Sequence, residues 1–218
     1  GSTDIPFGHI MEILAAPGTD PNSMIIWNIR LPRTIVAALV GVNLALSGAI
    51  LQAILRNPLA DPHLIGISSG AGVAGVVIMI LYPALEYLIT PVSFIGAMVA
   101  AICIYILAWK NGIKPVRIIL AGVAVSAFLS AGISGLMIFY SDRVHGALMW
   151  MVGGLAARSW PHVSIILPYA VIGVVLAMAS AAYLNILQLG DEMARGLGIN
   201  VEVTRIVLTA IAALLAAS

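Results

Sequence analysis

The sequence has little charge and a single cysteine. Of its 218 residues, 9% are charged and 61% are hydrophobic, and the mean hydropathy is +1.10. Soluble domains carry about 25% charged residues, so this composition argues strongly against a water-soluble fold. The lone Cys103 excludes an intrachain disulfide. The net charge of +1 is too small to indicate a nucleic-acid partner.

The sequence also lacks the motifs of nucleotide chemistry and hydrolysis. No GxxxxGK[ST] is present, so the chain offers no P-loop for a nucleotide. No Ser/His/Asp triad and no pair of catalytic carboxylates can be identified. The histidines lie far apart, with no i,i+4 pair and no nearby cysteine, which argues against metal ligation. We therefore expect a non-catalytic chain with no cofactor and no metal of its own.

Long apolar runs make up most of what is present. Five of them cover residues 35–55, 64–81, 92–109, 118–140 and 163–187, and a sixth covers 206–217. A helix needs about 20 apolar residues to cross a hydrocarbon core roughly 30 Å thick. The sixth run is too short for that, at about 1.5 Å per residue. The pattern predicts an all-α, polytopic transmembrane bundle with about five full spans and part of a sixth. Residues 1–218 are thus expected to form a single membrane domain that is a fragment.

The loops between the runs predict the topology. A chain that starts outside places Arg30, Arg33, Arg143 and Arg158 on the outer face, and the other six of the ten basic residues on the inner face. The positive-inside rule makes the face with six the cytoplasmic one. Residues 1–28 are expected to lie outside the hydrocarbon, with an amphipathic piece near residues 10–15.

None of the five long runs contains an acidic or basic residue. A proton-coupled carrier normally keeps such a residue in a span as its relay. This absence favours a passive conduit that takes its energy from a partner. Small residues are frequent in the runs, as in GISSGAGVAG at residues 66–75, and predict close packing between helices.

Five motifs, in order along the chain, resemble the permease subunits of type II ABC importers, the FecCD/BtuC-like family that moves iron–siderophore complexes, haem and cobalamin. They are IRLPR at 29–33, LVGVNLALSGAILQ at 39–52, RNPLADPHLIGISSGAG at 56–72, LAGVAVS at 120–126 and LGDEMARGLGINVEVTR at 189–205. The resemblance implies the family's permease fold. Family members have about ten spans, and this chain matches the region from just after the first helix to within the seventh.

The resemblance also implies roles for particular segments. Residues 29–75 form an outer-edge motif, a first span, an inner turn and the start of a second span. Residues 141–162 form an amphipathic outer helix, and residues 188–205 form a two-part cytoplasmic segment that couples to the ATPase, with a glycine break at Gly196 and Gly198. The coupling residues are Leu189, Gly190, Asp191, Glu192, Ala194, Arg195, Leu197 and Gly198.

Three further sets of residues follow from the same resemblance. Arg30 and Arg33 are expected to dock an extracytoplasmic binding protein, although they also suit a simple headgroup anchor. The expected cytoplasmic gate comprises Asn57, Leu59, Lys114, Pro115 and Val116, where the family usually has small polar residues in place of the last three. The expected substrate vestibule comprises Arg143, His145, Met149 and Trp150.

The function implied is the permease subunit of an inner-membrane ABC importer for an iron–siderophore, haem or a corrinoid. The implied partners are a second permease copy, two ATPase subunits that bind ATP and Mg²⁺, a substrate-binding protein and the bilayer. The first alternative is a secondary transporter or channel without an ATPase. The second is a membrane enzyme, for which the serines of the runs lack an activating histidine or aspartate. Nothing in the sequence selects among the three substrates.

Overall fold

The computed structural model describes residues 4–16, 18, 21–63, 66–110 and 114–217, and these residues form helices and connecting segments without a β-strand. Helices α1 to α11 are joined by a π-helical turn, η1, and two 3-10 turns, η2 and η3. In chain order they are α1 (Phe7–Ala15), α2 (Pro21–Ile25), η1 (Ile26–Arg30), α3 (Leu31–Leu55), α4 (Ile67–Leu81), η2 (Pro83–Leu88), α5 (Ile89–Ala108), α6 (Pro115–Phe139), η3 (Ser141–Arg143), α7 (Val144–Val152), α8 (Trp160–Ala179), α9 (Ala181–Gln188), α10 (Asp191–Gly196) and α11 (Val201–Ala217).

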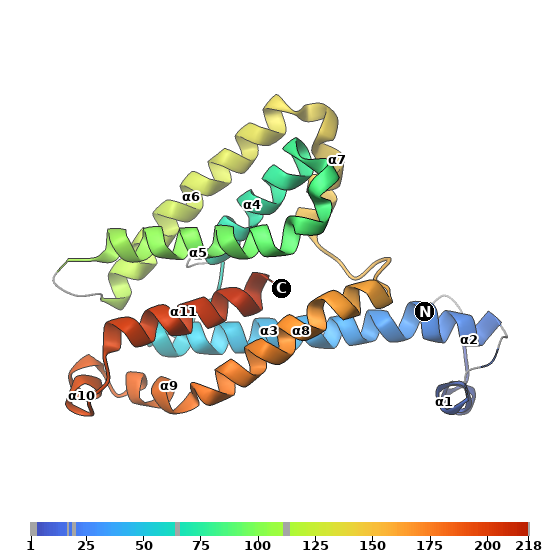
Figure 1. Cartoon of the computed structure of the whole chain (residues 1–218), viewed down its shortest axis with the longest axis horizontal. Helices are drawn as coiled ribbons and strands as arrows, with labels where there is room; N and C mark the ends of the chain where they lie inside the picture. Colours follow the sequence, from blue (N-terminus) through green and yellow to red (C-terminus); the bar gives the residue numbers. More distant parts are fainter. Residues whose placement is uncertain (1–3, 17, 19–20, 64–65, 111–113, 218) are drawn as a thin grey trace.

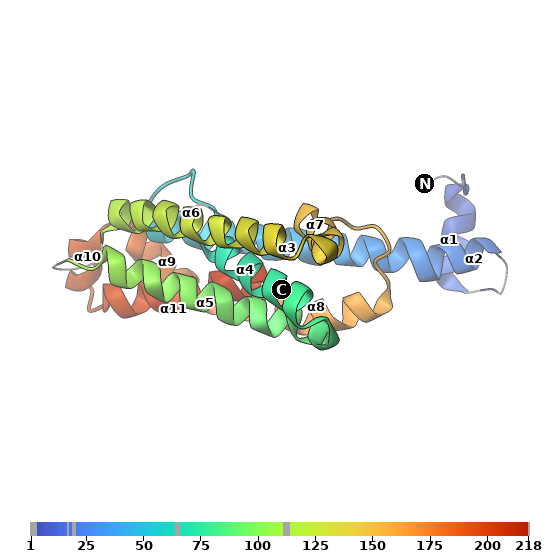
Figure 2. The ribbon, with the colours of Figure 1, turned by 90° about the horizontal axis from the view of Figure 1, so that it is seen from above.

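The helices lie in two groups. Helices α3, α8 and α11 pack against one another, and α4 packs against α5 and α6 (Figure 1). Helix α11 also contacts α5 and so joins the groups. Seen from above, α3 runs along the molecule, with α10 at one end and α1 and α2 at the other (Figure 2).

Four helices in the described residues are long and apolar enough to cross a membrane. They cover Pro21–Leu55, Pro83–Ala108, Pro115–Phe139 and Trp160–Ala179. The helix of the second apolar run, α4, has 15 residues and is shorter than the predicted span. Gly66 adopts a positive φ of 78° immediately before it, which holds the preceding chain out of the helix. Positions 64–65, where that predicted span begins, lie outside the described residues.

The first span begins earlier than the sequence indicated. Residues 21–28, expected to lie outside the hydrocarbon, are helical and belong to one helix of 35 residues that covers Pro21–Leu55. Pro32 has no N–H to donate to the preceding turn. The helix accommodates this by widening into η1, where the N–H of Leu31 donates to the carbonyl of Ile26.

The fifth predicted span is interrupted. Helix α8 ends at Ala179 and α9 begins at Ala181, so the run 163–187 is two helices rather than one. The hydroxyl of Ser180 donates to the carbonyl of Ala177 at 2.9 Å. Such back-bonding competes with the helical ladder and often bends a helix.

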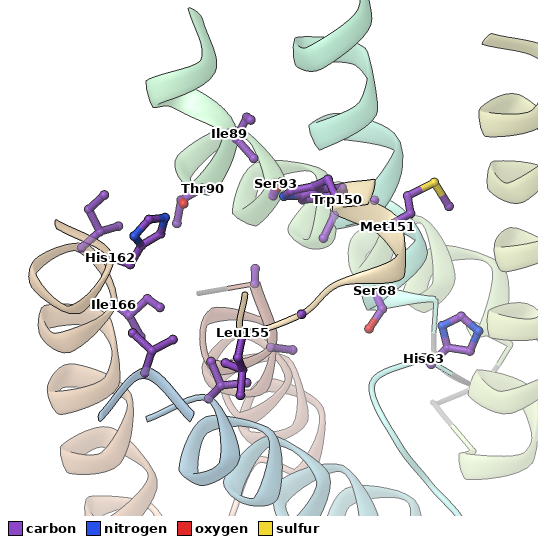
Figure 3. A pocket seen from close by; sticks show the side chains of 18 of the residues that line it. His63, Ser68, Ile89, Thr90, Ser93, Trp150, Met151, Leu155, His162 and Ile166 are labelled. Carbon is purple, nitrogen blue, oxygen red and sulfur yellow. The ribbon is translucent and has the colours of Figure 1, made fainter. Parts of the chain in front are cut away.

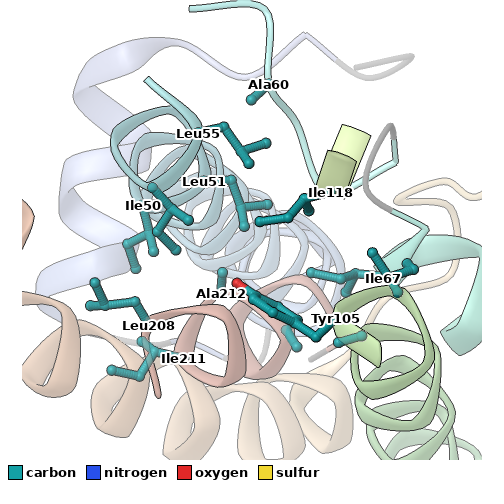
Figure 4. Close-up of a cluster of buried hydrophobic side chains, with 14 of the residues drawn as sticks. Ile50, Leu51, Leu55, Ala60, Ile67, Tyr105, Ile118, Leu208, Ile211 and Ala212 are labelled. Atoms are coloured by element: carbon teal, nitrogen blue, oxygen red, sulfur yellow. The ribbon is translucent and has the colours of Figure 1, made fainter. Parts of the chain in front are cut away.

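The main core lies where α3, α5, α6 and α11 meet. Ile50, Leu51 and Leu55 of α3 pack with Leu208 and Ala212 of α11, as Figure 4 shows. By contrast, most of α6 is not covered by the rest of the chain: Phe128 and Phe139 are 79% and 85% exposed. Large exposed apolar side chains of this kind suit lipid or another transmembrane surface.

Helices α4 and α5 approach closely at two glycines. A Cβ added at Gly70 would lie 2.5 Å from the carbonyl oxygen of Gly96, and a Cβ added at Gly96 would lie 2.5 Å from that of Gly70. The small residues expected to allow close helix packing do so in this pair.

Candidate functional site: the inner end of the bundle

The coupling segment and both predicted gate loops lie at the same end of the molecule. Helix α10, the end of α5 and the beginning of α6 lie at the left of Figure 1, and the hydrogen bond between Arg56 and Asp191 places the turn that follows α3 beside α10. Ala60 of the first loop and Ile118 of α6 belong to one buried cluster. The fold therefore brings together residues that are more than 130 positions apart in the sequence (from 57 to 198).

The coupling segment is a short helix between two glycines with positive φ. Gly190 (φ 107°) precedes α10 and Gly198 (φ 83°) follows it. Asp191 and Glu192 lie in its first turn and Arg195 in its last, which complements the helix dipole. Ala194 is fully buried and fixes this helix on the bundle. Helix α10 ends at Gly196 and α11 begins after Gly198, so the segment has two helical parts separated at these glycines.

Three apolar side chains of this segment point outward. Leu189, Met193 and Leu197 are 64%, 56% and 57% exposed. We call these three residues the apolar ridge. Leu189 follows the end of α9 before the break at Gly190, Met193 lies within α10, and Leu197 follows the end of α10, so the three side chains come from successive parts of the segment. Met193 was not among the predicted coupling residues.

Asp191 points inward. One carboxylate oxygen accepts from Arg205 Nη2 at 2.8 Å and the other accepts from Arg205 Nη1 at 3.1 Å. The first oxygen also accepts from Arg56 Nη2 at 3.2 Å. Asp191 is one of the predicted coupling residues, and in the structure it binds two arginines of its own chain. Glu192 remains exposed.

The burial of Arg205 was not predicted. The sequence placed it among the six basic residues of the inner face, and in the structure its side chain is 1% exposed within α11. Asp191, whose two carboxylate oxygens it binds, lies 14 residues away in the sequence, so no local spacing rule signals the pair.

The predicted gate residues have different environments. The side-chain oxygen of Asn57 accepts from the N–H of Leu59 at 2.9 Å, which closes the turn and leaves Leu59 77% exposed. On the second loop, Lys114 precedes α6, Pro115 begins it and Val116 is 66% exposed. Arg117 donates to the carbonyl of Lys110 and so ties the two ends of that loop. Positions 111–113, within this predicted basic turn, lie outside the described residues.

An ion pair joins α10 to α11 across the glycine break. Arg195 Nη2 lies 2.7 Å from Glu202 Oε1. The hydrogen bond from Arg195 lowers the pKa of Glu202 below its ordinary value of 4.5, and the charge of Arg195 acts in the same direction.

This pair should make the corner between α10 and α11 sensitive to acid. Because the folded-state pKa of Glu202 is lowered, its contribution to stability is present above the ordinary pKa and is lost as the pH falls through the folded one. We expect the thermal stability of the protein in detergent to decrease as the pH falls below the ordinary pKa of 4.5 and through the lowered pKa of Glu202. The decrease should be smaller in Glu202→Gln, measured under the same conditions. Identical pH profiles for the two proteins would contradict the assignment.

At the opposite end, the predicted docking residues lie beside an aromatic pair. Arg33 is exposed on the first turn of α3, and Arg30 is partly buried in η1. The rings of Trp27 and Trp160 stack with centroids 6.3 Å apart, and Trp160 Nε1 donates to the carbonyl of Trp27 at 2.8 Å. This contact joins the beginning of α8 to the helix that carries both arginines.

The four predicted vestibule residues do not form one site. Arg143 Nη1 donates to the carbonyl of Ile80 at 3.1 Å and thus caps the end of α4. Met149 is 60% exposed and His145 is also exposed. Within the described part of the chain, Trp150 alone of the four lines the cavity of about 740 Å³ between the two helix groups.

That cavity has a mixed lining. Figure 3 shows Trp150 near Ser93 on one wall and His162 beside Thr90 on another. Met151, Arg158 and His63 also line it. Met151, Arg158 and His162 belong to residues 144–162, so the segment after η3 lines the cavity with these three residues, which were not predicted, as well as with Trp150.

Comparison with known proteins identifies close relatives. The sequence model of the FecCD transport family matches residues 1–218. The cobalamin import system permease protein BtuC of Halobacterium salinarum is 39% identical over 196 residues, which cover 89% of this chain and 53% of that protein. The Fe(3+)-citrate import system permease protein YfmD of Bacillus subtilis is 35% identical over 211 residues, which cover 97% and 63%.

The iron(3+)-hydroxamate import system permease protein FhuG of Bacillus subtilis is 34% identical over 221 residues, covering 95% of this chain and 65% of that protein. A solved structure also matches, with a TM-score of 0.82 and 27% identity over 93% of this chain and 66% of the other. It is an inward-facing conformation of a transporter assigned to the metal-chelate type of ABC transporters. The chain spans about half to two thirds of the length of these proteins.

Proposed function

Because the chain belongs to the FecCD transport family, we propose that it forms the membrane-spanning core of an ABC importer permease for a metal chelate or corrinoid. It is an integral membrane protein with several apolar helices of spanning length. The names of its relatives favour a ferric chelate, such as an iron–siderophore complex, or cobalamin as cargo. Haem, which the motif resemblance also implied, belongs to the same proposal.

The observation that carries this proposal is the apolar ridge at the inner end. Leu189, Met193 and Leu197 expose apolar side chains on and beside the short helix α10, which Ala194 and Asp191 hold on the bundle. An exposed apolar surface rimmed by charged residues is typical of a docking site for another protein. The partner we propose is an ATPase subunit that binds ATP and Mg²⁺, present in two copies on a permease dimer.

The two ends of the fold suit different partners. The ATPase would push on α10, and the turn around Asn57 and Leu59 would open or close the inner exit. A loaded binding protein would dock at Arg30 and Arg33. The uncovered surface of α6 would face the second permease copy, so that the conduit lies between the two.

The test is assembly of the full-length permease with its candidate ATPase, followed by ATPase activity with and without loaded binding protein. We expect a stable complex whose ATPase activity rises when loaded binding protein is added. Absence of a complex with any ATPase would overturn the importer proposal and favour a secondary transporter.

Reversing the charges of Arg30 and Arg33 should weaken docking at the outer end. Arg30→Glu with Arg33→Glu places carboxylates where an acidic lobe of the binding protein would approach, which slows association by about tenfold or more. The measurement is the association rate of the loaded binding protein on permease reconstituted in nanodiscs. The matched control is Arg30→Lys with Arg33→Lys, which keeps the charge but loses bidentate pairing. A rate unchanged by the charge reversal would show that these arginines only anchor the helix end.

A further inference from the structure

Asp191 lies between two arginines whose surroundings differ. Arg205, on α11, has a side chain that is 1% exposed, whereas Arg56, at the end of α3, has one that is 37% exposed. The carboxylate of Asp191 is 21% exposed and contacts both. One acidic side chain therefore connects α10 to two other helices through one buried contact and one accessible contact.

The buried contact is suited to persist. Arg205 binds both carboxylate oxygens, at 2.8 and 3.1 Å, which is the strongest geometry for this pair. Separating the pair would leave a charge uncompensated in the interior, and breaking buried pairs is strongly destabilising. The carbonyl of Arg205 also accepts from the hydroxyl of Tyr105 at 3.3 Å, and that hydroxyl lies 2.6 Å from Thr209 Oγ1. Helix α10 is thus fixed to α11, and α11 to α5.

The accessible contact between Arg56 and Asp191 can open and close readily. Arg56 makes one hydrogen bond to Asp191, at 3.2 Å, and both side chains reach solvent. An exposed single contact of this kind contributes little and is easily replaced by water. Gly190 leaves room for it, since a Cβ there would lie 3.2 Å from Arg56 Nη1. The structure accommodates the guanidinium without enclosing it.

Arg56 is also directly joined to the inner turn. It has a left-handed backbone conformation, with φ 49° and ψ 42°, and immediately precedes Asn57, whose side chain closes the turn onto Leu59. A force on the Arg56 side chain therefore acts on the first residue of the turn. No other side chain has to relay it.

We propose that Asp191 is a positioning residue with one permanent and one switching contact. The pair with Arg205 holds α10 on the bundle in every state, and the pair with Arg56 forms in one state and opens in another. Movement of α10 thereby reaches the turn at Asn57 and Leu59. This inference rests on the proposed function, because it assigns to α10 the displacement that an ATPase would produce.

Replacing each of the two arginines by glutamine should have a different effect. In the assembled transporter, Arg56→Gln should leave assembly, thermal stability and ATPase activity near those of the unaltered protein, while cargo uptake per ATP hydrolysed falls about tenfold. Arg205→Gln should lower the thermal stability and the yield of assembled complex. Lys110→Gln is the matched control, since it removes an exposed inner-face charge without touching Asp191, and its coupling should be unchanged.

Conservative replacement distinguishes the switching contact from a structural one. Arg56→Lys keeps a cation opposite Asp191 and should restore a large part of the lost coupling. Full coupling in Arg56→Gln, or failure of that variant to assemble, would overturn the inference while leaving the importer intact. An unaltered permease that binds no ATPase would instead overturn the proposed function itself. The two failures are therefore separable in one set of measurements.

Discussion

Replacing Gly70 by valine should separate α4 from α5 and prevent the protein from reaching its folded state. A Cβ at this position would lie 2.5 Å from the carbonyl oxygen of Gly96 and 2.5 Å from the Cβ of Ala100. The first of these is a backbone atom of a neighbouring helix, so relief requires the whole helix to move. Overpacking of this kind costs about 3 kcal/mol, and valine adds two methyl groups beyond the Cβ.

The measurement is the thermal unfolding of purified protein in detergent, together with its elution profile. At Gly70→Ala, which adds only the Cβ, we expect a decrease on the order of 10 °C, and at Gly70→Val loss of the folded fraction. Gly41→Ala is the matched control, because nothing lies within 4 Å of an added Cβ there. That control should be neutral or slightly stabilising, since alanine favours a helix over glycine. Equal stability of Gly70→Val and the unaltered protein would show that the two helices do not pack as described.

Placing charge on the apolar ridge should abolish association with the ATPase. Leu189→Asp with Leu197→Asp inserts two carboxylates into a surface that docking would bury. Central apolar residues of an interface contribute about 2 kcal/mol or more each, so the pair should weaken binding by roughly 1,000-fold. Because both side chains are exposed, at 64% and 57%, folding should be unaffected.

The affinity of the purified permease for its ATPase provides the measurement, with the thermal unfolding temperature as the check on folding. Tyr87→Asp is the matched control: its ring is 75% exposed, and it lies in η2, on the other side of the spanning helix α5 from the inner loop. It should leave the affinity unchanged. If the doubly substituted permease binds the ATPase with the original affinity, the apolar ridge is not the docking surface.

The sequence predicts the spanning helices well because apolar runs report directly on burial in lipid. It predicts their ends less well. The run 163–187 shows no break, yet the structure has two helices that meet at Ser180, whose hydroxyl donates to the carbonyl of Ala177. A local hydrogen bond of this kind does not change the average hydropathy, so the sequence pattern gives no sign of the break. The helix that enters α3 begins ten residues before Leu31, since Pro32 is accommodated by a local widening rather than by termination.

In the candidate site, too, the segments could be predicted from the sequence but their detailed structure could not. The segment 188–205 and the turn at residues 56–59 are recognisable by their motifs, and the fold places both at one end. The direction of each side chain within them is not recognisable. A charge in a polar segment is normally assumed to face water, but Asp191 and Arg205 satisfy each other inside the bundle. Only the packing of α10 against α11 determines that the two meet.

The helix that begins at Pro21 and ends at Leu55 is a single rod. It carries Arg33 near its outer end, and Arg56 follows directly at its inner end. Between these two residues it is an unbroken α-helix of about 34 Å, at about 1.5 Å per residue. A rod of this length transmits a tilt without repacking along its course. We expect a tilt imposed on the outer end of this helix to move Arg56 at its inner end. The π-helical turn η1 precedes the straight stretch, so it does not interrupt the path between Arg33 and Arg56.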